Sequence, residues 1–248
     1  MSANNGNKLS WATAAKFIGA VAALITAIVA VINLIPTGSS PSPHFFQGNY
    51  HHYDPLHFQV NYVYRPGGKG PLKPLNEGEV LHSGDHYKIQ FTPQEDSYVY
   101  IFQIDSSYAI YRLFPMTSFK GVTVNNQNPV RAGVTYTLPT KDKSFQLDNQ
   151  RGKETLYFMA FRQPNQDLDD QYDTLLEARQ QNNPVRANQL ETQLAQNLKT
   201  RGLAAIINDP QQAEAKISWS EGETFSVPAQ RLDKLCSTCV SIVTFEHR

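Results

Sequence analysis

The sequence lacks several features that would assign it to a class of protein. It contains only two cysteines, Cys236 and Cys239, which excludes a scaffold held together by several disulfides. Lys and Arg together number 22, as do Asp and Glu, so no global electrostatic field favours nucleic acid or an acidic substrate. We therefore expect no nucleic-acid partner.

The common catalytic motifs are missing as well. The chain contains no GxSxG, HExxH, GxGxxG or GxxxxGK[ST] sequence, which are the signatures of several hydrolase, metalloprotease and nucleotide-binding classes. We expect a protein with no catalytic activity, no cofactor and no metal. One alternative stays open, an envelope hydrolase whose Ser, His and Asp residues are dispersed along the chain and meet only in the fold.

A long apolar run dominates the N-terminal region. Phe17 to Ile35 carries no charge, and as a helix these 19 residues would span roughly 28 Å, close to the thickness of a bilayer's hydrocarbon core. Lys8 and Lys16 both precede the run, and no Asp or Glu occurs in residues 1–35. The positive-inside rule therefore predicts a cytoplasmic tail over 1–10 and a single transmembrane helix over 11–35. A cleaved signal peptide and a buried helix are the competing interpretations.

A Pro- and Ser-rich linker follows the apolar run. Residues 36–43 read PTGSSPSP, and residues 44–57 form a segment rich in His and aromatic residues, so we assign 36–57 to a linker and strap. Four of the seven histidines lie in this strap, at positions 44, 51, 52 and 57. Transition-metal binding is the alternative interpretation of these histidines, but their spacing fits no helical ligand pair, so we interpret the segment as a strap lying over a sheet.

The remaining chain, 58–248, predicts a mainly β domain. Short alternating segments bounded by Gly, Pro, Asn or Asp recur at roughly ten-residue spacing, which is typical of a β-sandwich-like fold. The segment 98–115 is unusual because both alternating sets of its first arm are largely apolar. We expect a second sheet to cover one face of this hairpin and an added layer to cover the other.

Two helices are predicted as an insert over about 166–208. Leu190, Leu194 and Leu198 form an apolar stripe at helical spacing, and Asn183 followed by Pro184 is a favourable helix start. We expect this insert to supply the added layer.

The two cysteines stand three residues apart. Because an exported domain is oxidised, a disulfide between Cys236 and Cys239 is plausible and would be structural. A redox role would require a helix to begin at the pair, and a strand-like segment follows instead.

Several motifs resemble a known bacterial family. The turn Ser83-Gly84-Asp85 before a strand, the apolar YVYIFQID arm, the LFP that closes its hairpin, and later the AGVTYTLP, FQLD and GKE segments occur in this order. Over about residues 72–162 this pattern is similar to domain of unknown function 4384. The resemblance implies a β-sandwich-like extracytoplasmic module, here anchored in a bacterial inner membrane with its C-terminal domain in the periplasm. It implies no catalytic residues.

For function, we expect a binding or accessory module that recognises a protein, a peptide or an envelope ligand. Loops on a rigid scaffold concentrate recognition, so we expect the surface at the hairpin tip and in the predicted loop 116–129. The candidate binding residues are Asp105, Tyr108, Tyr111, Arg112, Phe119, Asn125 and Asn126. The competing interpretation is that Tyr111 and Phe119 belong to the core.

Overall fold

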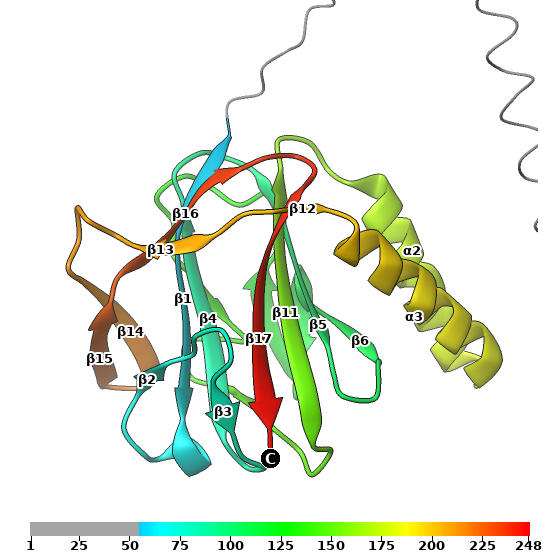
Figure 1. Cartoon of the computed structure of the whole chain (residues 1–248), viewed down its shortest axis with the longest axis horizontal. Helices are drawn as coiled ribbons and strands as arrows, with labels where there is room; N and C mark the ends of the chain where they lie inside the picture. Colours follow the sequence, from blue (N-terminus) through cyan, green and yellow to red (C-terminus); the bar gives the residue numbers. More distant parts are fainter. Residues whose placement is uncertain (1–54) are drawn as a thin grey trace, which may run out of the picture. The chain divides into compact units, whose positions relative to one another are not determined.

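Two facing β-sheets with two helices beside one of them make up the part of the chain that the computed structural model describes, residues 55–248 (Figure 1). The expected cytoplasmic tail, the transmembrane helix and nearly all of the linker and strap lie outside the described residues. Within residues 55–248, no helix is long and apolar enough to cross a membrane.

The first sheet is antiparallel throughout, and its central strand β1 pairs with β4 and β16. Its strand order is β10-β4-β1-β16-β13, with β2 added to β1 and β9 added to β4. The strands span Leu56–Arg65 (β1), Lys73–Pro74 (β2), His86–Pro93 (β4), Tyr136–Leu138 (β9), Phe145–Gln146 (β10), Ile206–Asn208 (β13) and Gln230–Leu235 (β16).

The second sheet has β11 at its centre, paired antiparallel with β5 and β17. Its order is β12-β17-β11-β5-β6, with β3 added to β17. The strands span Val80–Leu81 (β3), Tyr98–Ile104 (β5), Ile110–Phe114 (β6), Gly152–Phe161 (β11), Gly202–Leu203 (β12) and Cys239–His247 (β17). The mainly β prediction is therefore confirmed.

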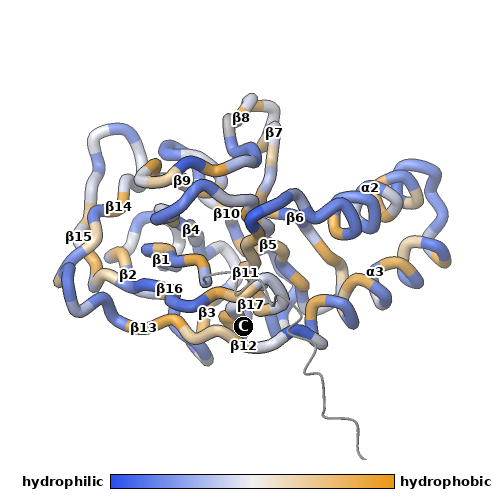
Figure 2. Tube along the Cα trace, turned by 90° about the horizontal axis from the view of Figure 1, so that it is seen from above, coloured by the Kyte–Doolittle hydropathy of each residue, from blue (hydrophilic) through white to orange (hydrophobic). Residues whose placement is uncertain are grey.

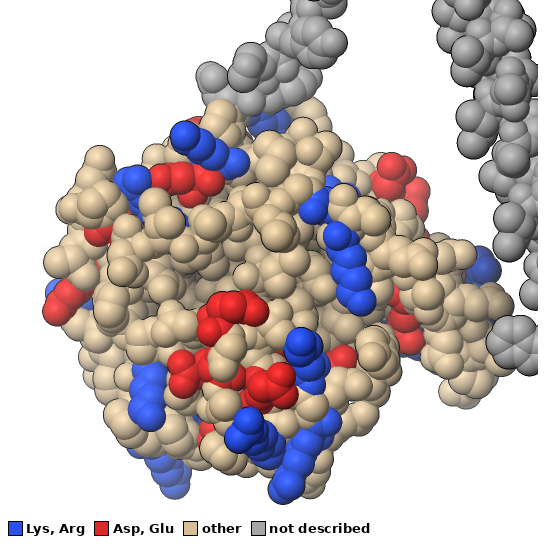
Figure 3. All heavy atoms as spheres, in the orientation of Figure 1, with Lys and Arg blue, Asp and Glu red and all other residues tan. Residues whose placement is uncertain are grey.

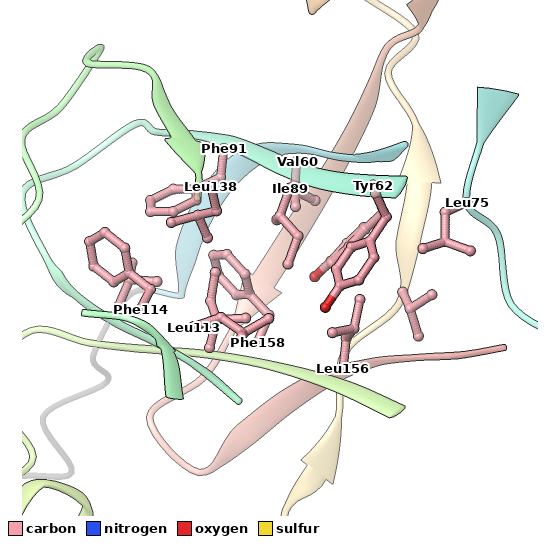
Figure 4. Packing of buried hydrophobic residues seen from close by; sticks show 14 of the residues in the cluster. Val60, Tyr62, Leu75, Ile89, Phe91, Leu113, Phe114, Leu138, Leu156 and Phe158 are labelled. Atoms are coloured by element: carbon pink, nitrogen blue, oxygen red, sulfur yellow. The ribbon is translucent and has the colours of Figure 1, made fainter. Parts of the chain in front are cut away.

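The core lies between the two sheets. Val60, Ile89 and Phe91 of the first sheet point toward Leu156 and Phe158 of the second (Figure 4). Each of these side chains is essentially inaccessible to solvent, and burying a large apolar side chain contributes roughly 1.5–3 kcal/mol. This shared cluster holds the sheets face to face.

The hairpin β5–β6 is covered on both faces, as its sequence predicts. Val99 and Ile101 join the core between the sheets, whereas Tyr100 and Phe102 pack under helices α2 (Gln166–Gln180) and α3 (Pro184–Lys199). Seen from above, the two helices lie side by side next to this part of the second sheet (Figure 2). The doubly apolar arm is therefore a central strand between a sheet and a helical layer.

The helices begin as predicted but end earlier. Asn183 caps α3 by accepting a hydrogen bond from the Arg186 N–H, and Leu190, Leu194 and Leu198 are buried. The insert was expected to reach about residue 208, yet α3 ends at Lys199. The segment beyond it forms β12 and β13, because its backbone finds hydrogen-bonding partners at the edges of the two sheets.

The predicted loop 116–129 is wrong in part, because a hairpin occupies most of it. Strands β7 (Met116–Phe119) and β8 (Val122–Asn126) pair through a two-residue turn, Lys120-Gly121, in which both φ angles are positive. Two consecutive positive φ angles are the signature of the tight turns that match strand twist. Thr, Ser and Asn residues outnumber the apolar ones in both strands together, so the sequence resembles a loop, although Val124 is buried and Met116 and Phe119 pack against the core.

A second hairpin, β14 (Glu214–Ser220) and β15 (Glu223–Pro228), is fastened to the first sheet by a buried lysine. Nζ of Lys88 donates to the backbone oxygens of Lys141 at 2.6 Å and Trp219 at 2.5 Å, with longer contacts to Thr140 and Ser218. The ammonium also lies 5.2 Å from the centroid of the Trp219 ring. Backbone carbonyls and an aromatic ring thus replace the water that burial removes from Lys88.

Candidate functional site

A cavity of about 200 Å³ opens at the end of the domain where the C-terminus is labelled in Figure 1. We call it the hairpin cavity. It lies beside the β5–β6 turn, the start of β11 and the β7–β8 turn. Its lining residues are Tyr87, Gln103, Asp105, Tyr111, Phe119, Lys120, Phe145, Gln146, Leu147, Asp148, Gln150 and Glu154.

The β5–β6 turn is built around Asp105. Its Oδ1 accepts hydrogen bonds from the backbone N–H groups of Ser107 at 2.8 Å and Ala109 at 2.9 Å, and from the Ser107 hydroxyl. An aspartate that satisfies its own turn in this way fixes the path of the chain. Tyr108 follows with a φ of 68° and is 74% exposed. Asp105 therefore shapes one wall of the cavity.

The buried acid of the cavity is Glu154, on β11. Only 3% of its surface is exposed. Burial raises the pKa of Glu154 to about 7, and the charges of Asp105 and Asp148 add to the rise, while hydrogen bonds from the Gln103 side chain and the Ser106 backbone oppose it. A carboxyl group with a strongly shifted pKa in a cavity is a common mark of a functional site.

Glu154 is part of a chain of polar contacts. Nε2 of Gln103 donates to Glu154 Oε2 at 2.9 Å, and the Tyr87 hydroxyl donates to Gln103 Oε1 at 2.6 Å. On the other side, Nδ1 of His247 lies 3.8 Å from Glu154 Oε1, and its Nε2 hydrogen-bonds with the Ser83 hydroxyl at 3.1 Å. His247 is buried, and its Nδ1 makes no hydrogen bond within the described part of the chain.

Sequence reasoning did not select Glu154, His247 or Ser83. A signal was nevertheless present, because Ser83 begins the Ser83-Gly84-Asp85 turn and Glu154 ends the GKE segment on which the family resemblance rests. Pairing of Gly152 with His247 brings the start of β11 beside the end of β17. The topology thus gathers these residues at one end of the sheets.

Aromatic rings form another wall of the cavity. Phe145 stacks on Tyr87 with ring centroids 5.0 Å apart and meets Phe119 edge-on at 5.3 Å. Nζ of Lys120 lies 5.5 Å from the centroid of the Phe119 ring. Tyr111 is 45% exposed, so its ring is accessible from solvent.

Three of the seven residues predicted as a binding surface line this cavity, namely Asp105, Tyr111 and Phe119. Phe119 is also partly buried against the core, so this residue both lines the cavity and contributes to the core. Tyr108 is exposed at the hairpin tip and does not line the cavity. The backbone of Asn125 lies in β8.

Arg112 and Asn126 have structural contacts instead. Arg112 forms ion pairs with Asp169 at 3.2 Å and Asp173 at 3.4 Å, and its guanidinium lies 4.6 Å from the Tyr172 ring centroid. It therefore joins β6 to α2. Asn126 is buried, and its Nδ2 donates to the Pro139 carbonyl at 2.7 Å.

Cys236 and Cys239 are joined by a disulfide in the turn between β16 and β17. Cys236 also lines a hollow of about 420 Å³, together with Leu56, Phe161 and Leu235, at the end of the domain away from the hairpin cavity. Among residues 55–248, no group of three or more His, Cys, Asp and Glu side chains could hold a metal ion.

The surface carries charges of both signs. On the face shown in Figure 3, acidic side chains gather in the lower half with basic side chains around them. Acidic and basic residues, which are equally numerous in the sequence, are thus mixed on this face and not separated.

Comparison with protein families finds a similarity in the middle of the chain. The family model described as "Domain of unknown function (DUF4384)" matches residues 80–164, which supports the resemblance drawn from the motifs. No curated protein and no solved structure matches the chain. The matched segment runs from β3 through β11, so it contains every lining residue of the hairpin cavity.

Proposed function

We propose that this protein is a binding module without catalytic activity, and that the hairpin cavity receives a group of a protein, peptide or envelope ligand. The observation that carries the proposal is the convergence of Asp105, Tyr111 and Phe119 on one cavity with the buried acid Glu154. A concave site with aromatic walls and a few polar groups is the usual form of a ligand-binding site.

The state of Glu154 supports recognition rather than a structural role. Among residues 55–248, its one ion-pair contact is with His247 at 3.8 Å, beyond hydrogen-bonding distance. A buried carboxyl group held for stability is ordinarily paired with a base or fully hydrogen-bonded. Glu154 accepts hydrogen bonds from the neutral Gln103 side chain and Ser106 backbone, but in the described part of the chain no base lies within hydrogen-bonding distance of it. This supports a role in which a ligand supplies the missing positive charge.

We further propose that the domain is a β-sandwich-like periplasmic module attached to the bacterial inner membrane by one helix. The support is the uncharged run Phe17–Ile35, with Lys8 and Lys16 on its N-terminal side. Protease added to spheroplasts should digest a C-terminal tag and spare an N-terminal one. The reverse pattern would contradict this topology.

The binding site is tested by photo-crosslinking in cells. A photoreactive amino acid replaces Tyr111 in the full chain, and a matched control replaces Val185, which is 68% exposed on α3. We expect adducts from position 111 that are lost when Glu154→Gln is added. Adducts of equal yield at both positions, or none at position 111, would contradict the site.

A second candidate function is hydrolysis, because Ser83, His247 and Glu154 follow one another as in a catalytic triad. The 3.1 Å contact between the Ser83 hydroxyl and His247 is within the range for a nucleophile and its base. However, the histidine is 3.8 Å from the carboxylate that would orient it, and Ser83 is not among the residues that line the cavity. Ester or peptidoglycan turnover that disappears in Ser83→Ala would favour the hydrolase over the binding module.

A further inference from the structure

We infer that the hairpin cavity binds a positively charged group, a primary amine or a guanidinium, through its carboxylates and aromatic rings. The inference rests on the proposed function and adds the chemical class of the ligand. It depends on three observations, namely the charge of the lining, the geometry of the aromatic wall and the buried polar group behind the cavity.

The lining is acidic. Three carboxylates, those of Asp105, Asp148 and Glu154, face a single basic side chain, Lys120. The charges of Asp105 and Asp148 both act on Glu154 strongly enough to raise its pKa further. Carboxylates that repel one another in a partly enclosed space favour the entry of a cation, because a cation relieves this repulsion. An anionic ligand would be repelled by the same carboxylates.

The aromatic wall provides the second observation. Phe119, Phe145 and Tyr87 line the cavity, and the face of an aromatic ring attracts ammonium and guanidinium groups within about 6 Å of its centroid. The protein's own Lys120 ammonium already lies over Phe119, at 5.5 Å from the ring centroid. The rim of the cavity therefore accepts a cation in the geometry that we infer for the ligand.

The third observation is the buried polar group next to Glu154. His247 is only 2% exposed, its Nδ1 has no hydrogen-bond partner, and this atom lies 3.8 Å from the Glu154 carboxylate. The acidic cluster is therefore backed by an unpaired imidazole nitrogen instead of an Arg or Lys. The printed hydrogen bonds to the carboxylate come from the neutral Gln103 side chain and Ser106 backbone, so within residues 55–248 no Arg or Lys balances its charge.

The inference predicts the direction in which the binding affinity changes with pH. Glu154 attracts a cation only when it is ionised, and burial raises its pKa to about 7, so affinity should increase as the pH rises through 7. The charged or titratable groups around it are Asp105 in the turn, Asp148 after β10, His247 on β17 and Lys120 between β7 and β8. Tyr87 is linked to it by hydrogen bonds through Gln103 and also interacts with its charge.

The experiment uses the purified full chain in detergent and three small probes. N-acetyl-lysine methylamide and N-acetyl-arginine methylamide supply the two cations, and N-acetyl-norleucine methylamide is a neutral analogue with a similar aliphatic chain. We expect at least one cationic probe to bind tenfold or more tightly than the neutral one at pH 8, with this preference reduced at pH 5.5. Equal binding of cationic and neutral probes would overturn the inference.

Variants assign the effect to the cavity. Glu154→Gln should weaken binding of the cationic probe about tenfold, which corresponds to about 1.4 kcal/mol. Asp170→Asn, on an exposed position of α2 outside the cavity, should leave it unchanged. Lys120→Met removes the competing ammonium and should strengthen binding at least twofold. An equal loss in Glu154→Gln and Asp170→Asn would mean that the cation binds elsewhere.

The outcome separates this inference from the proposed function. If position 111 gives Glu154-dependent crosslinks but the probes show no preference for positive charge, the cavity binds a ligand of another class and only the inference fails. If neither crosslinks nor probe binding occur at the cavity, both fail.

Discussion

Gly152 and Ser106 touch across the gap between the start of β11 and the β5–β6 turn. A Cβ atom added to Gly152 would lie 2.6 Å from Ser106 Cβ, and the φ of Gly152 is 139°, a conformation that other residues rarely adopt. The contact brings the Ser106 backbone within hydrogen-bonding reach of Glu154. Gly152 therefore allows the hairpin turn to close over the buried acid.

The first prediction concerns this contact. Gly152→Ala should destabilise the domain by about 1–3 kcal/mol, because the new methyl group meets Ser106 and the backbone conformation is strained. Chemical denaturation of the full chain measures the effect. The control is Gly202→Ala, where the nearest atom to an added Cβ is 3.7 Å away and no comparable loss is expected. Equal stability of the two variants would mean that the turn can move aside at little cost.

The second prediction concerns pH and Glu154. Because the pKa in the folded state, about 7, lies above the ordinary value of 4.5, the stability that this group contributes is present below pH 4.5 and is lost as the pH rises to 7. Glu154→Gln should remove this loss and be more stable than the wild type at pH 8, on the order of 1–3 kcal/mol. Denaturation curves at pH 5 and pH 8 measure both effects.

The opposite result would be equally informative. If Glu154→Gln is less stable than the wild type at pH 8, the ionised carboxylate stabilises the fold. Glu154 would then have a structural role that does not depend on a ligand. A variant that is more stable and yet loses crosslinking from position 111 would show the trade between stability and function that is typical of binding sites.

The third prediction separates Arg112 from the binding residues. Its two ion pairs and its contact with Tyr172 join β6 to α2, so Arg112→Ala should reduce stability by about 1–2 kcal/mol. Below its melting temperature the variant should still form crosslinks from position 111. Arg131→Ala breaks the exposed pair with Asp96 and serves as the control, for which we expect no measurable change in stability because solvent screens exposed ion pairs. Loss of crosslinking by a fully folded Arg112→Ala would return Arg112 to the recognition surface.

The fourth prediction concerns the buried ammonium of Lys88. Lys88→Met keeps most of the volume but leaves backbone carbonyls, including those of Lys141 and Trp219, without their donor. We expect a loss of about 1–3 kcal/mol and faster amide hydrogen exchange in β14 and β15 than elsewhere. Lys216→Met, at an exposed position of β14, should change neither. Uniformly faster exchange across the domain would indicate that Lys88 stabilises the whole fold and not this hairpin in particular.

The architecture could be predicted from the sequence wherever the apolar pattern of a segment shows which of its faces must be covered. The two apolar faces of 98–104 required two covering layers, and the leucine stripe of α3 identified one of them. The hairpin β7–β8 was missed because its apolar residues are scattered among Thr, Ser and Asn residues that are typical of a loop. That Val124 is buried and that Met116 and Phe119 pack against the core is visible only in the fold.

The candidate site could be predicted only in part, for a different physical reason. Asp105 and Tyr111 lie in a turn and an adjacent strand, where recognition residues are commonly found. Glu154 and His247 meet through the pairing of β11 with β17, and nothing local in either segment specifies that register. Likewise, the ion pairs of Arg112 with α2 depend on how the helix docks, so a residue typical of binding surfaces was assigned to recognition.

The direction of β1 has a practical consequence. Strand β1 begins at Leu56 and runs toward Arg65, which pairs with His86 at the same end of the sheets as the β5–β6 turn (Figure 1). A handle attached ahead of Leu56 therefore enters the domain at the pole remote from the cavity. Immobilising the protein through its N-terminal side on a biosensor surface should therefore leave the cavity end of the domain facing the analyte.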